Sequence, residues 1–104
     1  MKHGTMLGLW IVRSLDTATT VLARVQDELY VLAFSSAVRA NQCTQALGAD
    51  GRPFYVCAAN VESVVRDARA SGARGFIVDY DANAARFASA HPLPDPATLV
   101  RELR

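Results

Sequence analysis

The segment over residues 52–81, RPFYVCAANVESVVRDARASGARGFIVDYD, constrains the fold most, because an amphipathic helix lies in it between two apolar runs. The helix carries apolar side chains at the i, i+3, i+4 and i+7 positions of one face: Val61, Val64, Val65 and Ala68. Asn60 is predicted to cap this helix, and Gly72 supplies the left-handed residue that ends it. The runs over 54–58 and 75–80 are short and apolar, as buried strands are. Two strands joined by a helix are predicted to run in the same direction, since a helical crossover returns the chain to the same end.

The N-terminal third of the chain predicts three strands, over residues 7–13, 19–25 and 29–34, which are rich in β-branched and aromatic side chains. The reversals between them are too short for a crossover, so the strands are predicted to form an antiparallel meander. A competing interpretation makes residues 17–29 a helix. Two threonines followed by Val-Leu-Ala-Arg-Val favour the strand.

Three further helices are predicted. Ser35 or Ser36 can cap the first, which extends through Leu47. Its inward side is expected to carry Ala37, Ala40, Cys43 and Leu47. Residues 81–91 have helical composition. Asp95 is expected to cap a last helix, with Pro96 in its first turn, that continues through ATLVRELR (97–104).

The resulting order, β-β-β-α-β-α-β-α-α, predicts an α/β fold. We expect a mixed five-stranded sheet in which an antiparallel meander is followed by a parallel βαβαβ unit. Helices pack against this sheet in a two-layer or three-layer sandwich. A chain of 104 residues fits a single domain over 7–104, preceded by a flexible leader over 1–6.

Charge argues against nucleic acid and anionic membranes as partners, and the cysteines bear on redox state and location. Eleven basic residues against ten acidic ones give a net charge of +1, which favours neither nucleic acid nor an anionic membrane. No apolar run approaches the ~20 residues of a membrane span. Cys43 and Cys57 form no metal-ligand motif and lie among apolar neighbours, so we expect buried free thiols and a cytoplasmic location.

Polar residues follow the predicted parallel strands, at the sheet edge where α/β proteins bind ligands. The candidate ligand-binding residues are Ser35, Ser36, Asn60, Asp79, Tyr80 and Asp81. Asp79 and Asp81 are two residues apart, so their carboxylates can point the same way and share a Mg²⁺ ion beside a phosphate held at helix N-termini. The competing interpretation is that Ser36 and Asn60 only cap their own helices, and that Asp81 or Asn83 caps the next one.

The enzyme classes considered lack essential residues. Asp79-Tyr80-Asp81 has the acid spacing of haloacid-dehalogenase-type phosphatases, but the Gly-Thr that should follow is absent and the strand is the wrong one. A cysteine paired with His91 would need an exposed, reactive thiol. No phosphate-binding glycine loop is present in the sequence. We therefore leave enzymatic activity open, favour a non-catalytic role, and expect no cofactor or metal.

Aromatic residues on the strands suggest packing and one contact surface. Tyr30 and Tyr55 alternate with apolar residues and are interpreted as packing at the edge of the core. Trp10 has the same interpretation, but a tryptophan on an edge strand is also suited to anchor a partner.

The run LYVLAFSSAVRANQCTQALG resembles the serine-sensitivity-enhancing (SseB-like) domain, where a strand leads through Phe-Thr-Ser into a helix. Phe34, Ser35 and Ser36 occupy those positions, with Ser35 in place of threonine. The hairpin over 10–25 and the run VESVVRDARASGARGFIVDYD follow the same pattern, so the resemblance covers residues 7–82. It departs where the family has Asn-Pro or Asp-Pro, because the last strand here ends in Asp-Tyr-Asp.

This resemblance implies a bacterial α/β interaction module without catalytic residues. The leading hypothesis is thus a non-catalytic module that binds a protein partner or a second copy of itself. The alternative is a small-ligand or Mg²⁺/phosphate-binding protein that uses Asp79 and Asp81. A third hypothesis is an accessory or immunity-like domain that acts only beside a neighbouring chain.

Overall fold

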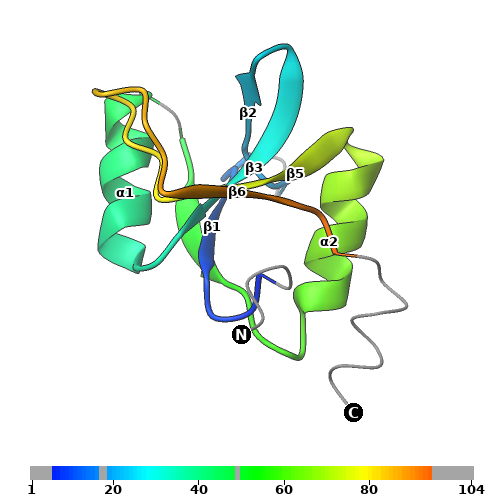
Figure 1. Ribbon diagram of the computed structural model, residues 1–104. Coiled ribbons are helices and arrows are strands. Elements are labelled where there is room, and N and C mark those ends of the chain that lie inside the picture. Colours follow the sequence, from blue (N-terminus) through cyan, green and yellow to red (C-terminus); the bar gives the residue numbers. More distant parts are fainter. Residues whose placement is uncertain (1–5, 17–18, 49, 95–104) are drawn as a thin grey trace.

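The computed structural model describes residues 6–16, 19–48 and 50–94, and within these the chain forms one mixed sheet of six strands and two helices (Figure 1). The strands are β1 (Trp10–Arg13), β2 (Leu22–Val25), β3 (Glu28–Phe34), β4 (Arg52–Tyr55), β5 (Ala73–Val78) and β6 (Ser89–Pro92). The helices are α1 (Ala37–Ala46) and α2 (Val61–Ala70). The α/β fold with a mixed sheet is as the sequence predicts, with one strand more than expected.

The sheet has the order β4-β1-β3-β5-β6, and β2 pairs with β3 beside this path. β3 runs parallel to β5 and antiparallel to β1, which in turn runs antiparallel to β4. The predicted common direction of β3, β4 and β5 is therefore present, although β1 lies between β3 and β4. Trp10 lies opposite both Phe34 and Tyr55, and Ala33 lies opposite Val78, so the three strands end at one edge of the sheet.

The first three strands are antiparallel neighbours, but they do not form a simple meander. β1 pairs with β3 only at Trp10 and Ile11. Further along β1, the Val12 carbonyl accepts a 2.8 Å hydrogen bond from the N–H of Val21, immediately before β2. β1 and β2 therefore share one side of β3. The strand at Leu22–Val25 confirms the strand interpretation over the helical one for the described residues of 17–29.

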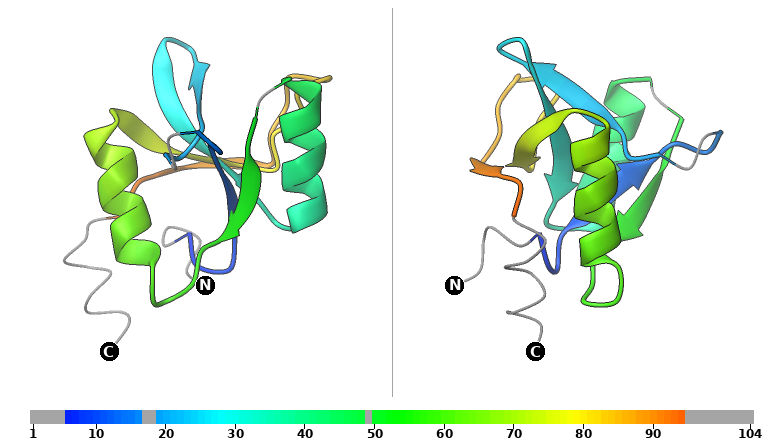
Figure 2. Two further views of the ribbon diagram at one scale, coloured as in Figure 1. Left: turned by 180° about the vertical axis from the view of Figure 1, so that it is seen from behind. Right: turned by 90° about the vertical axis from the view of Figure 1, so that its right-hand side faces the viewer.

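The two helices cover opposite faces of the sheet, which makes a three-layer arrangement (Figures 1 and 2). One face places Ile11, Val31 and Phe76 against the four apolar side chains of α2, and all of these are buried. The other face places Val12, Leu32 and Ile77 against Ala40 and Cys43 of α1. Side chains alternate between faces along each strand, so one strand supplies both cores.

Several sequence-based boundaries are wrong. The expected inward residue Leu47 follows α1 and is 47% exposed. The fourth strand covers residues 52–55 rather than 54–58, because Arg52 and Pro53 pair with β1. Met6, which the sequence places in the leader, is 1% exposed and belongs to the core. The expected last helix, capped by Asp95 and continuing to residue 104, lies outside the described residues.

The helix expected over residues 81–91 is also wrong, because this segment forms a hairpin that returns as β6. A bridge between Asp81 and Arg86 closes its tip, and Ser89–Pro92 pairs with β5. Gly75 makes this close pairing possible: a Cβ atom there would lie 2.2 Å from the carbonyl oxygen of His91. Strand pairing thus overrides the helical preference of the alanines. In the described part of the chain, neither helix has the length and apolar character required to cross a lipid bilayer.

Candidate functional site

Asp79 and Ser35 meet at the common edge, where β5 and β3 end. Asp79 Oδ1 accepts a 2.8 Å hydrogen bond from the N–H of Ser35, and the Ser35 hydroxyl lies 2.9 Å from Oδ2 and 3.1 Å from Oδ1. The Asp79 backbone has φ 56°, a left-handed conformation that aspartate tolerates better than most residues. Asp79 therefore holds the ends of two neighbouring strands together.

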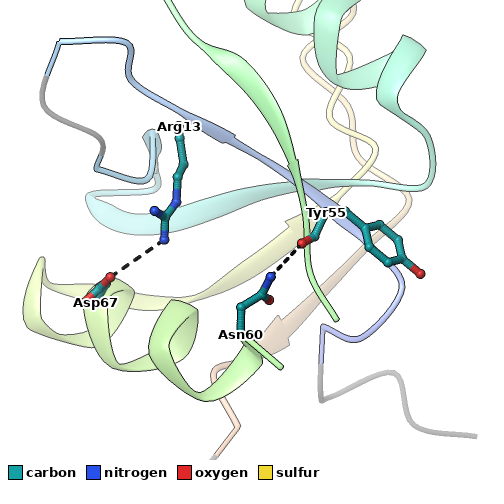
Figure 3. A network of polar contacts seen from close by, with 4 residues as sticks. All are labelled: Arg13, Tyr55, Asn60 and Asp67. Carbon is teal, nitrogen blue, oxygen red and sulfur yellow. Dashed lines mark hydrogen bonds and ion pairs between the residues drawn. The ribbon is translucent and has the colours of Figure 1, made fainter. Parts of the chain in front are cut away.

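Asn60 has a different role from the predicted helix cap. Its Oδ1 accepts a hydrogen bond from the N–H of Cys57 at 3.0 Å, and its side-chain amide donates to the Tyr55 carbonyl at 3.0 Å (Figure 3). No side-chain hydrogen bond from Asn60 caps α2. The residue instead fixes the loop that leads from β4 into α2.

Ser36 and Asp81 bind backbone groups of their own segments. Ser36 Oγ accepts the N–H of Arg39 at 3.2 Å and caps α1, as one of the two predicted serines should. Asp81 Oδ1 accepts the N–H groups of Asn83 and Ala84 at 3.0 and 3.3 Å. Asp81 thus caps the turn of the β5–β6 hairpin, not a helix.

A pocket of about 310 Å³ lies between α1 and the start of the hairpin. Its lining residues are Phe34, Arg39, Gln42, Cys43, Ala46, Asp79, Tyr80, Asp81, Ala82 and Asn83. The structure therefore gathers three predicted residues, Asp79, Tyr80 and Asp81, at one pocket, whereas Ser36 and Asn60 do not line it. The sequence analysis does not identify Arg39 and Gln42 as pocket residues, although Cys43 belongs to its predicted inward face. The i, i+3, i+4 spacing of Arg39, Gln42 and Cys43 is the signal that places them on one side of the helix.

Cys43 is buried at this pocket and is suited to packing rather than to nucleophilic chemistry. Burial raises the pKa of its thiol, and the negative charge of Asp81 raises this pKa further. His91 lies on β6, where its ring stacks on Phe76 with centroids 5.0 Å apart. Its Nε2 is 2.9 Å from the Ser89 hydroxyl, so the described contacts of His91 do not form the considered cysteine–histidine pair.

A cation shared by Asp79 and Asp81 would compete with existing hydrogen bonds, because both Asp79 oxygens already contact Ser35. Among the residues that the structure describes, no three histidine, cysteine or acidic side chains gather closely enough to hold a metal ion.

Trp10 and Tyr55 form a second surface feature, on the neighbouring strands β1 and β4. Their ring centroids are 5.0 Å apart with planes tilted by 55°. Trp10 is half-buried against the α1-side core, and Tyr55 is 47% exposed. Tyr55 is therefore a surface residue, contrary to the packing role expected from the sequence.

The outer edge of β4 is poorly suited to pair with another strand. The N–H of Val56 donates to the Leu9 carbonyl, toward the β1 side. The main-chain N–H and carbonyl of Tyr55, one residue earlier, therefore face away from β1. The outward carbonyl of Tyr55 is already bound by Asn60. Pro53, also outward by alternation, has no N–H to donate. A partner at this edge would therefore be recognised mainly by side chains.

Comparison with known proteins adds no relative, because no protein-family model, curated protein or solved structure matches the chain. The fold and surface define a small three-layer α/β domain. Its resemblance to the SseB-like domain stays a prediction.

Proposed function

We propose that this chain is a non-catalytic module that binds a protein partner through the surface formed by Trp10 and Tyr55. The half-exposed Tyr55 on the edge strand β4, held against Trp10, is the observation that supports this function. Trp10 itself lies on β1, between β4 and β3, and not on an edge strand as the sequence suggested. Tyrosine and tryptophan supply much of the binding energy at protein interfaces. They bury large areas while few torsion angles become ordered.

The aromatic pair is also prepared for binding before a partner arrives. Trp10 packs against the core on the α1 side and restricts the ring of Tyr55 beside it. Below it, the Tyr55 carbonyl is fixed by Asn60. A surface that is already ordered loses less conformational entropy on association.

The proposal agrees with the role that the SseB-like resemblance implies. The free thiols of Cys43 and Cys57 support a reducing, cytoplasmic location for the module. The pocket beside Asp79 and Asp81 favours the small-ligand alternative. A Mg²⁺ or phosphate site there has less support, because Asp79 would have to release Ser35.

Photo-crosslinking in the cells that make the protein tests the proposal. A photoreactive phenylalanine analogue replaces Tyr55 in one variant and Ser63, exposed on α2, in a matched control. We expect a covalent adduct of defined mass, either with another protein or with a second copy of the chain, from position 55 only. Equal yields of the same adducts from both positions, or no adduct from position 55, would overturn the proposed function.

A further inference from the structure

The end of the β1–β4 ribbon opposite Trp10 carries two like charges side by side. Arg13 and Arg52 are directly paired across β1 and β4, so their side chains project from the same face of the sheet. Like charges in this arrangement lower stability. The position therefore needs an explanation that packing alone does not supply.

Neither guanidinium group is well neutralised by the described residues. Arg13 Nη2 is 3.9 Å from Asp67 Oδ2, the limit of an ion pair, and that aspartate side chain is 64% exposed (Figure 3). Arg13 Nε is buried and has no hydrogen-bond partner in the described structure. Arg52 is exposed, and no hydrogen bond or ion pair of its side chain occurs within the described chain. The Arg52 guanidinium is thus free to bind a ligand, and beside it the partly exposed Arg13 guanidinium has only one long ion pair.

The surroundings fix one arginine and add an apolar wall. The guanidinium carbon of Arg13 lies 4.2 Å from the ring centroid of Phe54, a cation–π contact that holds its plane. A hollow of about 360 Å³ adjoins both arginines, with Ser14, Leu15, Pro53 and Phe54 as its other lining residues. Leu15 is 55% exposed. A ligand with a carboxylate beside an apolar group would match both parts of this hollow.

We propose that the hollow binds an acidic segment of the partner protein, with a carboxylate between Arg13 and Arg52 and a neighbouring apolar side chain against Leu15 and Pro53. Arginine binds carboxylates through paired, charge-assisted hydrogen bonds. Tyr55 lies three residues beyond Arg52, roughly 10 Å along the same edge strand and facing the other side. A partner that straddles β4 therefore contacts both places, and in this respect the inference rests on the proposed function.

Arginine side-chain NMR tests the charge recognition without the natural partner. The probe is a capped Gly-Glu-Leu-Glu-Leu-Gly peptide, with the Gln-for-Glu peptide as its uncharged counterpart, up to about 5 mM so that millimolar affinity is detected. We expect the Nε–H signals of Arg13 and Arg52 to shift with the acidic peptide only. The signal of Arg66, which pairs with Glu62 at 2.6 Å, serves as the internal reference and should stay in place.

Two variants of exposed arginines complete the test. Arg52→Thr should weaken peptide binding at least about tenfold, the loss expected for a charge-assisted contact. Arg24→Thr, on β2, should leave binding unchanged, because Arg24 does not line the hollow and its guanidinium donates to the Asp27 carbonyl of its own hairpin. Absent shifts, equal shifts with the uncharged peptide, or undiminished binding by Arg52→Thr would overturn the inference.

The crosslinking experiment separates this inference from the proposed function. An adduct at position 55 together with a failed peptide titration would leave the module in place and remove only the acidic segment. Specific peptide binding without an adduct would retain the arginine site and reject the Trp10–Tyr55 surface.

Discussion

The two ends of the sheet differ in how their polar groups are used. At the end where β3 and β5 terminate, Asp79, Ser36 and Asp81 each bind a group of the same chain. At the other end, Arg13 and Arg52 face each other with little compensation. Buried polar groups almost always have partners within the fold, and like charges directly opposite each other on two strands lower stability. The comparison assigns a structural role to the polar groups of the acidic end, where the proposed Trp10–Tyr55 surface also lies, and leaves the two arginines of the basic end available for the binding proposed above.

Replacing Asp79 gives the largest effect that the comparison predicts. Asp79→Ala removes the hydrogen bonds to Ser35 and places alanine at φ 56°, so we expect a loss of about 2–3 kcal/mol in the free energy of unfolding. Urea denaturation measures it, with Asp81→Ala as the control that removes only a turn cap. Similar small losses in both variants would mean that Asp79 is not structural.

Removing one of the paired arginines should have a smaller effect of the opposite sign. Arg52→Thr relieves the repulsion from Arg13 and places a strand-forming residue on an edge strand, so stability should rise by about 0.5 kcal/mol. Differential scanning calorimetry of this variant and Arg24→Thr at low salt checks it. A stability loss specific to Arg52→Thr would show that the arginine supports the fold and would weaken the contrast between the two ends.

The smallest effect is a pH dependence at the acidic end. Burial and Asp81 raise the pKa of the Cys43 thiol in the folded chain, so the folded state retains this proton at pH values where the unfolded chain releases it. This contribution to stability is complete below the ordinary pKa of 9.0 and is lost as the pH rises through the higher folded value. Denaturation of the wild type and Cys43→Ala between neutral and alkaline pH should show a steeper alkaline decline in the wild type. Parallel curves would contradict the raised pKa.

The sequence predicts the elements whose pattern is local. The period of Val61, Val64, Val65 and Ala68 places α2 correctly, and the direction shared by β3, β4 and β5 follows from the helices between them. It misses β6, because the alanines before it favour a helix and only the close approach at Gly75 reveals the pairing. It likewise gives no sign that β1 lies between β3 and β4, which depends on long-range pairing.

The sequence predicts several of the residues that gather at the candidate site, but not the contacts that these residues make. The ends of the parallel strands indicate where Asp79, Tyr80 and Asp81 gather. The hydrogen bonds from Ser35 to the Asp79 carboxylate are visible only in the structure. Arg13 and Arg52 are 39 positions apart in the sequence, and no local pattern links them. They lie opposite each other only because β1 pairs with β4, and β2, β3 and α1 separate these two strands in the sequence.

The outer edge of β4 has little capacity to bind another main chain. The Tyr55 carbonyl already accepts a hydrogen bond from the Asn60 amide, and Pro53 has no N–H to donate. If the proposed partner binds on that flank, its affinity would depend on the side chains exposed there, while the hydrogen-bonded main chain beneath them would stay the same. Under the proposed function, substitutions at Arg52 or Tyr55 would therefore change the partner without a change of fold.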